Sequence, residues 1–127
     1  LYKLGINFGI IFQITDDILD YFGDIQTGKE IGKDFMEGKI TLPIILLLEK
    51  VSKNNRLKLK RIFMKKTRNQ KDLNFTMSQL ESFGIKEYCI EYARKFQKKS
   101  EIILNGFNNK QSKLLKELMV SSIERQN

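Results

Sequence analysis

The 127-residue sequence contains no histidine, one cysteine and one proline. Without histidine, imidazole is excluded both as a general base and as a metal ligand. The single thiol, Cys89, excludes an internal disulfide framework and a zinc site built on paired cysteines. We therefore expect any bound metal to be held by oxygen atoms. Cys89 itself is expected to be a packing residue rather than a nucleophile, because no cationic neighbour or base is evident.

Long stretches of the sequence lack both proline and glycine, and 41% of the residues are apolar. This composition is typical of a globular, mostly helical chain. No strand pattern and no internal repeat is visible, so the sequence predicts an all-α fold. Apolar periodicity predicts helices at about residues 2–22, 42–52, 54–67, 72–83, 86–104 and 111–125. The loop at 23–38, which holds four of the eight glycines, has room for one short helical turn.

Local residue patterns predict how these helices end and which side each one buries. Gly23 suits a left-handed cap at the end of the first helix, and Pro43 fits the first turn of the second. The apolar residues expected to face inward are Leu57, Leu59, Ile62 and Phe63 in the third helix, Tyr88, Tyr92 and Phe96 in the long helix, and Leu114, Leu115, Leu118, Met119 and Ile123 in the last.

The net charge of +8 is unevenly distributed. Residues 1–48 carry four lysines against seven acids, whereas residues 49–127 carry nineteen basic residues against eight acids. Basic residues without interleaved aromatics and glycines argue against RNA binding, and we expect no nucleic-acid partner. Solvated lysine faces are one interpretation of the basic half, and an anionic surface such as lipid headgroups or a partner chain is the other.

The longest uncharged apolar run, "LGINFGIIFQIT" at residues 4–15, is too short to cross a bilayer. With no sorting signal visible, we expect a cytoplasmic protein that has at most a peripheral membrane contact. Because the chain opens on Leu1 rather than methionine, we also expect that the true N-terminus is missing.

Residues 12–43, "FQITDDILDYFGDIQTGKEIGKDFMEGKITLP", contain seven of the fifteen acidic residues. At about 100° per residue, one arc of the first helix holds Gln13, Asp16, Asp17 and Asp20, and the opposite core side holds Phe8, Ile11, Phe12, Ile18, Leu19 and Phe22. Clustered carboxylates repel each other unless a cation neutralises them, and the end of a helix disfavours them. From the helix alone, a metal site and a solvated acidic patch both remain open.

The segment that follows favours the metal site. Lys29, Lys33 and Lys39 alternate with Gly28, Gly32 and Gly38, and small residues let amides and ammonium groups approach a phosphate. Magnesium prefers one or two carboxylates plus phosphate oxygens. An EF-hand is not indicated, because the alternating oxygen ligands and closing glutamate of that loop are absent. The pattern predicts a diphosphate bridged by Mg²⁺.

Two quoted segments resemble the trans-type polyprenyl diphosphate synthases, the family of the farnesyl, geranylgeranyl and octaprenyl diphosphate synthases. "GIIFQITDDILDYFGD" is similar to the family's second aspartate-rich motif, and "GKEIGKDFMEGKITLP" to the segment after it. The residues from 83 onward are similar to its C-terminal helices. The resemblance implies that residues 1–127 are the C-terminal part of a single synthase domain, folded as a partial helical bundle, without the half that carries the first aspartate-rich motif.

The resemblance also implies a role for individual residues. Asp16 would bind Mg²⁺ directly, and Asp17 and Asp20 would support the ion directly or through water. Phe12 would line the substrate pocket, Gln13 would face the allylic substrate, Lys29 would contact the leaving diphosphate, and Lys39 would assist electrostatically. The implied catalytic residues are Asp16, Asp17 and Lys29. The implied reaction condenses isopentenyl diphosphate head to tail with an allylic prenyl diphosphate, in an enzyme expected to be a dimer when complete.

Because the first aspartate-rich motif is absent, we expect this chain to be a fragment that is inactive alone. One alternative is a non-catalytic helical subunit, or the remnant of a split gene, that pairs with a partner prenyltransferase chain. Another is an enzyme of the squalene or phytoene synthase kind, although that resemblance does not account for the GKxxGxD and GKxTLP spacing. Retention of Asp16, Asp17, Asp20, Lys29 and Lys39 argues against a purely structural role.

Overall fold

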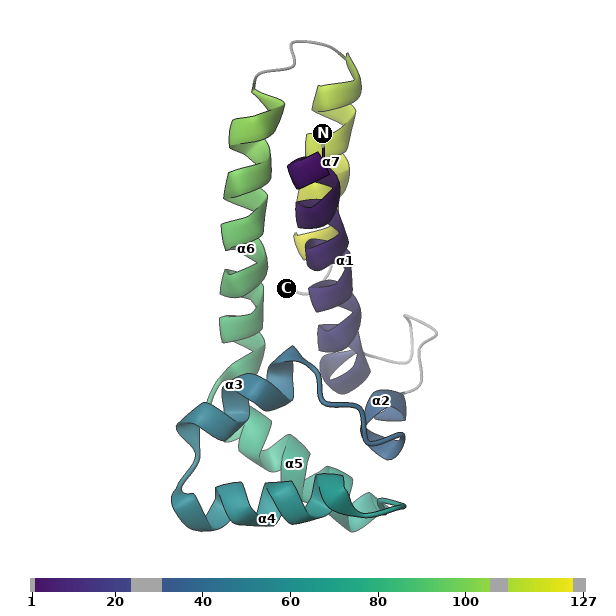
Figure 1. Ribbon diagram of the computed structural model, residues 1–127, viewed down its shortest axis with the longest axis vertical. Coiled ribbons are helices and arrows are strands. Elements are labelled where there is room, and N and C mark those ends of the chain that lie inside the picture. Colours follow the sequence, from purple (N-terminus) through teal and green to yellow (C-terminus); the bar gives the residue numbers. More distant parts are fainter. Residues whose placement is uncertain (1, 24–30, 106–109, 125–127) are drawn as a thin grey trace. The chain divides into compact units, whose positions relative to one another are not determined.

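The computed structural model describes residues 2–23, 31–105 and 110–124 (Figure 1). These residues form seven helices and no strand. The helices are α1 (Tyr2–Phe22), α2 (Lys33–Met36), α3 (Leu42–Lys50), α4 (Lys53–Met64), α5 (Gln70–Ser82), α6 (Ile85–Leu104) and α7 (Lys110–Glu124). The all-α prediction is therefore confirmed. The short turn expected in the glycine-rich segment is α2. Within these ranges, no helix has the length and apolar character needed to cross a membrane.

The chain divides into two compact units, and the division falls within α1 and within α6. The first unit contains Leu1–Asp16 and Ile90–Asn127, and the second contains Asp17–Cys89. In the first unit, α6 runs in the opposite direction to α1 and α7 (Figure 1). Its buried apolar residues are Ile11, Ile14, Ile90, Ala93, Met119 and Ile123.

The second unit has its own core, in which three aromatic rings connect α1, α2 and α4. Tyr21 and Phe35 are fully buried, and their ring centroids lie 6.5 Å apart in an edge-to-face arrangement. Phe35 meets Phe63 in the same geometry at 5.4 Å. Such aromatic pairs contribute about 0.5–1.5 kcal/mol beyond the area they bury. Phe35 therefore anchors the four-residue helix α2, which is too short to be stable by itself.

Local sequence signals mark the starts of three helices in this unit. Pro43 lies in the first turn of α3, where its missing amide hydrogen costs nothing. Ser52 caps α4 by accepting a hydrogen bond from the Asn55 amide at 3.3 Å. Asn69 and Asp72 form a reciprocal capping box at the start of α5, which satisfies two amide donors that a helix leaves unpaired.

Several predictions about ends and faces were wrong. Gly23 does not adopt the left-handed conformation, since the described glycines with positive φ are Gly32, Gly38 and Gly84. It is required for a different reason: a Cβ at residue 23 would lie 2.5 Å from the carbonyl oxygen of Leu19. The helical period located the apolar stripe of each helix. It was less successful in predicting which residues of that stripe neighbouring elements cover. The residues expected to be buried that are exposed are Phe12, Leu57, Tyr88, Tyr92, Leu114 and Leu118.

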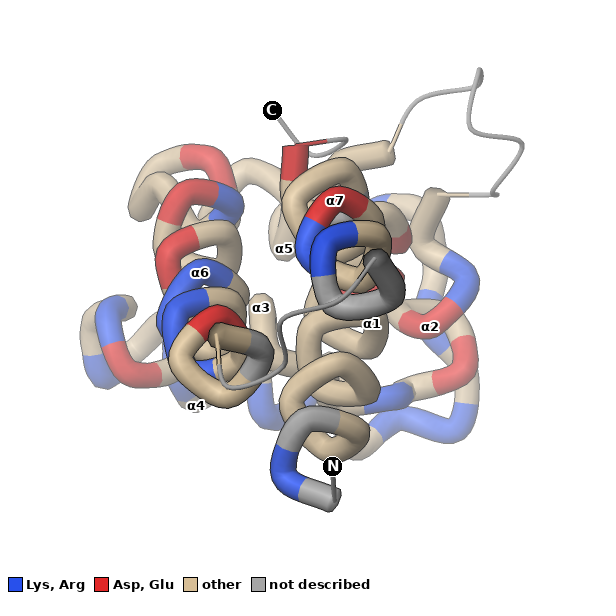
Figure 2. Tube along the Cα trace, turned by 90° about the horizontal axis from the view of Figure 1, so that it is seen from above, with Lys and Arg blue, Asp and Glu red and all other residues tan. Residues whose placement is uncertain are grey.

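Charge is distributed differently along the helices. Figure 2 shows α6 with interleaved basic and acidic positions, whereas the first turns of α1 are almost free of charge. Helix α4 is different from both, because its sequence KNNRLKLKRIFM contains five basic residues and no acid. The positive charge of residues 49–127 is therefore not evenly distributed among the helices.

Candidate functional site

The three aspartates near the end of α1 differ in exposure. Asp16 is exposed, whereas Asp17 and Asp20 retain only 5% and 0% of their accessible surface. The helical projection placed all three on one acid side of the helix, and it did not distinguish the exposed carboxylate from the buried ones. Among these three, Asp16 is the carboxylate that solvent and a dissolved ion can reach.

Asp20 connects the end of α1 to the glycine–lysine segment. Its Oδ1 accepts a hydrogen bond from the amide of Asp34 at 3.0 Å, and its backbone carbonyl accepts one from the amide of Gly32 at 2.8 Å. Gly32 is the N-cap residue of α2 and has no side chain to satisfy the first amides of that helix. The Asp20 carboxylate supplies this cap from a distance of fourteen residues in sequence, with the charge that a helix N-terminus favours.

Gly32 is needed at this connection for two reasons. Its φ of 85° lies in the left-handed region, which side chains with a Cβ rarely adopt. A Cβ there would also lie 2.9 Å from Cδ2 of the buried Leu73. The glycine in the motif therefore allows the chain to turn from the end of α1 into α2 while staying in contact with α5.

The other end of α2 is held by an arginine that the sequence did not single out. Arg68 donates from Nη2 to the carbonyl of Met36 at 3.4 Å, and from Nη1 to the carbonyl of Lys65 at 2.7 Å. A Cβ at Gly38, whose φ is 75°, would lie 2.7 Å from Arg68 Nη2. Sequence motifs do not reveal such a residue, because its partners are backbone carbonyls rather than charged side chains.

Of Lys29 and Lys39, the two lysines to which the resemblance gives a role at the diphosphate, the structure describes Lys39. Its amide donates to the carbonyl of Asp34 at 2.9 Å, which fixes its backbone just after α2, and its side chain is exposed. Lys29 lies outside the described residues. The pairing of Lys29 with the aspartates therefore stays a prediction.

The residues predicted to contact the allylic substrate lie in the middle of α1. Phe12 and Gln13 are both exposed, and the ring of Phe12 stacks on that of Phe8 at a centroid distance of 6.0 Å. Among the described atoms, nothing lies within 4 Å of a Cβ built on Gly5 or Gly9. Space is therefore open beside this part of the helix, as a long apolar substrate would require.

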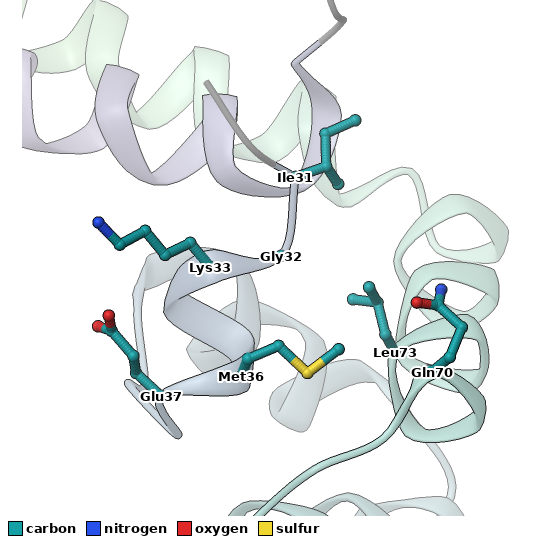
Figure 3. A pocket seen from close by; sticks show the side chains of 7 residues that line it. All are labelled: Ile31, Gly32, Lys33, Met36, Glu37, Gln70 and Leu73. Carbon is teal, nitrogen blue, oxygen red and sulfur yellow. The ribbon is translucent and has the colours of Figure 1, made fainter. Parts of the chain in front are cut away.

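A cavity of about 280 Å³ opens in the second unit between α2 and the start of α5 (Figure 3). Met36 and Leu73 form its apolar part, while Lys33 and Glu37 project together from α2 at its edge. Its remaining lining residues are Ile31, Gly32 and Gln70. Lys33 and Gly32 of the predicted glycine–lysine segment line the cavity, whereas none of the residues assigned a role by the family resemblance does.

Two buried groups near the motif have altered proton affinities. Burial raises the pKa of the Tyr21 hydroxyl, and the carboxylates of Asp20, Asp34 and Asp17 raise it further, so this hydroxyl stays protonated. Burial, together with Asp17 and Glu87, raises the pKa of the Cys89 thiol to about 12. Cys89 is fully buried, and a protonated buried thiol is a packing residue and a poor nucleophile.

The carboxylates near the end of α1 are compatible with a bound Mg²⁺ ion that has few protein ligands. Within the described ranges, no group of three or more Asp, Glu or Cys side chains is placed to hold a metal ion. Magnesium does not require such a cage, because it binds through one or two carboxylates and completes its shell with water and phosphate oxygens. The exposed Asp16 satisfies this requirement, whereas Oδ1 of Asp20 already caps α2.

Comparison with known proteins gives consistent matches. The Polyprenyl synthetase family model matches residues 1–80. The chain is 39% identical over 90 residues to an all-trans-nonaprenyl-diphosphate synthase of Rhodobacter capsulatus. This match covers 70% of this chain and 27% of that protein. Among solved structures, octaprenyl pyrophosphate synthase from Helicobacter pylori matches with a TM-score of 0.81 at 34% identity, covering 95% of this chain and 38% of that one.

A further match is the polyprenyl synthase from Caulobacter crescentus, solved with calcium and isoprenyl diphosphate. Its TM-score is 0.87 at 28% identity, and the match covers 98% of this chain and 39% of that one. The chain thus spans roughly a quarter to two fifths of the length of these relatives. Because the family model matches 80 of the 127 residues and the folds agree, this chain belongs to the polyprenyl synthetase family.

Proposed function

We propose that this chain is the C-terminal catalytic part of a trans-type polyprenyl diphosphate synthase and that Asp16, Asp17 and Asp20 are its second aspartate-rich motif. The observation that carries the proposal is the pair of hydrogen bonds from Gly32 and Asp34 to Asp20. These bonds join the acid-bearing end of α1 to the segment that contains the lysines. The bonds also cap α2, and a diphosphate site needs in addition cations next to carboxylates, which the lysines of this segment can supply.

Asp16 is the residue we expect to hold Mg²⁺, through its exposed carboxylate. Asp17 and Asp20 are buried, so their support of the ion would act through water or through the field of their charges. Bound Mg²⁺ would supply positive charge against a departing diphosphate. Calcium in the Caulobacter crescentus relative supports a divalent ion in this family.

The remaining residues of the proposed site bind and orient the substrate. Lys29 and Lys39 would hold diphosphate oxygens by charge-assisted hydrogen bonds. Phe12 and Gln13 would contact an allylic prenyl chain along α1, where space is open beside Gly5 and Gly9. An apolar wall without a nucleophile excludes water from the cationic carbon that forms when the diphosphate leaves. The double bond of isopentenyl diphosphate would then attack that carbon, and the new cation would lose a proton to an oxygen of the released diphosphate, which leaves a double bond in the elongated product.

The proposed substrates are an allylic prenyl diphosphate and isopentenyl diphosphate. The isoprenyl diphosphate bound to the Caulobacter crescentus relative supports this class. Because the chain spans about two fifths of that relative, we propose that it is inactive alone. From the family resemblance, we also propose that the complete enzyme is a dimer. Assay of the chain with Mg²⁺ and both substrates should yield no elongated product, and elongation would contradict this part of the proposal.

The binding role is tested by titrating the chain with a prenyl diphosphate by calorimetry, with and without Mg²⁺. We expect binding that requires Mg²⁺ and that weakens by about tenfold or more in Asp16→Ala, because the one exposed carboxylate of the motif is lost. Glu117→Ala is the matched control, since it removes an exposed carboxylate from α7. It should bind as the unmodified chain does.

A non-catalytic helical subunit predicts a different result. Such a subunit would bind no prenyl diphosphate, or would bind it equally well with and without Mg²⁺. Equal affinities of Asp16→Ala and the unmodified chain would also contradict the proposed function. Head-to-head condensation by a reconstituted enzyme would instead indicate chemistry of the squalene or phytoene synthase kind.

A further inference from the structure

The outward side of α4 combines positive charge with exposed apolar side chains. At 100° per residue, positions 53, 57, 60, 61 and 64 fall within an arc of about 100°, opposite the buried Leu59 and Ile62. We define the α4 outer face as Lys53, Leu57, Lys60, Arg61 and Met64, all of which are exposed. Met64 is the extreme case, with 84% of its surface accessible.

The cations of the α4 outer face are not used inside the fold. Among the described residues, Lys53, Lys60 and Arg61 make no side-chain hydrogen bond and no ion pair. Some basic residues outside the face, among them Arg56 and Lys65, do have structural contacts. Arg56 donates from Nε to the carbonyl of Leu48 at 2.9 Å, and Lys65 pairs with Asp72 at 2.8 Å.

The charge around this face has a single sign. No acidic residue occurs between Glu49 and Asp72, whereas ten lysines and arginines do. In α6, by contrast, three glutamates are interleaved with five basic residues, as on an ordinary solvated helix. The difference indicates that α4 meets an extended anionic partner rather than solvent alone.

We propose that the α4 outer face lies on an anionic phospholipid surface. Lysine and arginine gain binding energy near anionic lipids, their aliphatic stems reach along apolar surface, and Leu57 and Met64 can enter the boundary between headgroups and acyl chains. A bilayer requires no shape complementarity. A twelve-residue helix about 18 Å long offers roughly 200 Å² on one side, far below the ~800 Å² per partner of a stable protein interface.

Nucleic acid fits this face less well, because no aromatic ring is available there for base stacking. The rings of Phe63, in α4, and Phe75, in α5, already have partners in the fold. Phe63 packs against Phe35, and Lys58 lies over the ring of Phe75 with its Nζ 3.8 Å from the centroid. The lipid surface is therefore the occupant that both the charge and the apolar residues favour.

The inference is tested by co-sedimentation of the chain with vesicles. We expect binding to mixed phosphatidylcholine and phosphatidylglycerol vesicles and little binding to pure phosphatidylcholine. The triple variant Lys53→Gln, Lys60→Gln, Arg61→Gln should bind about a hundredfold more weakly, at about fivefold for each cation. The matched control is Arg94→Gln, Lys98→Gln, Lys113→Gln, which removes three exposed cations from α6 and α7 and should retain most of the binding.

A fluorescence experiment identifies the face that touches the lipid. The sequence has no tryptophan, so Met64→Trp introduces a single reporter, and its emission should shift to shorter wavelength when anionic vesicles are added. Lys98→Trp, a reporter on an exposed position of α6, should show no shift. Circular dichroism checks that each variant keeps its helical content.

Four results would overturn the proposal. The first two are an absence of binding to anionic vesicles and an equal loss of vesicle binding in the two triple variants. The third is an emission of Met64→Trp that does not shift when the protein binds vesicles. The fourth is that the unmodified chain binds a single-stranded oligonucleotide and the α4 triple variant does not, while the same variant still binds vesicles. The assays contain no prenyl diphosphate and no Mg²⁺. Their outcome is therefore independent of the proposed synthase function.

Discussion

At the scale of single residues, burial separates carboxylates that sequence treats alike. Asp16, Asp17 and Asp20 lie within five residues of each other in sequence, yet of the three only Asp16 is exposed, and Asp20 caps a helix that begins thirteen residues later. Periodicity placed these residues on one side of α1. It could not reveal their burial, because burial depends on how α2 folds back onto the end of α1.

Tyr21 gives a prediction at this scale. Its hydroxyl is buried and has no hydrogen-bond partner among the described atoms, and an unsatisfied buried hydroxyl costs about 1–3 kcal/mol. Tyr21→Phe keeps the ring that packs against Phe35 and removes the hydroxyl. We therefore expect the free energy of unfolding in urea to rise by about 1 kcal/mol.

The control for this change is Tyr92→Phe, which removes the hydroxyl of an exposed tyrosine. Its free energy of unfolding should stay within about 0.5 kcal/mol of that of the unmodified protein. A loss of stability in Tyr21→Phe, with the control unchanged, would show that the buried hydroxyl is hydrogen-bonded.

At the scale of elements, helix existence and ends were largely predictable, and helix faces were less so. Pro43 placed the start of α3, and the gap between the helices predicted at 72–83 and 86–104 separated α5 from α6. These signals act on the local backbone and need no knowledge of the fold. Leu57 and Tyr88 show the limit, since each has apolar neighbours at helical spacing but lies outside the core. The covered side of a helix is decided by neighbouring elements.

The start of α5 gives the prediction at this scale. The Asn69 side chain accepts a hydrogen bond from the Asp72 amide at 2.9 Å, and the Asp72 carboxylate accepts one from the Asn69 amide at 3.1 Å. Asn69→Ala should lower the free energy of unfolding by about 1 kcal/mol, because the cap is lost. Asn69→Asp should restore it, since aspartate caps as well as asparagine.

Lys71→Ala is the control within the same turn of α5, because Lys71 is exposed and contributes no cap. Thermal denaturation followed by circular dichroism measures all three variants. Equal stability of Asn69→Ala and Lys71→Ala would show that the capping box does not stabilise this helix.

At the scale of the whole molecule, the family could be identified from the motif and its spacing, whereas the division into two compact units could not. The boundary at Asp17 falls inside a continuous helix, and the one at Cys89 falls inside another. No proline or glycine marks either place. Helical propensity determines where α1 and α6 run, but the division reflects which residues pack together at long range in sequence.

Cys89, the last residue of the second unit, reports on unfolding because it is the single thiol of the chain. Its pKa is about 12 in the folded protein against an ordinary value of 9.0, so the unfolded state loses this proton first as pH rises. Below about pH 9 the thiol is protonated in both the folded and the unfolded state, so its ionisation does not change the free energy of unfolding. Above that pH, the free energy of unfolding should fall by roughly 1.4 kcal/mol per pH unit until about pH 12.

Cys89→Ala isolates this contribution from the titration of lysines and tyrosines, which is common to both proteins. Urea unfolding of the two proteins at several pH values between 7 and about 11 measures their difference in stability. That difference should be constant up to about pH 9 and then change in favour of the variant, because only the unmodified protein has a thiol to ionise on unfolding. Two curves that stay parallel to pH 11 would mean that the folded protein does not keep this thiol protonated, and that Cys89 is reached by solvent without unfolding of the second unit.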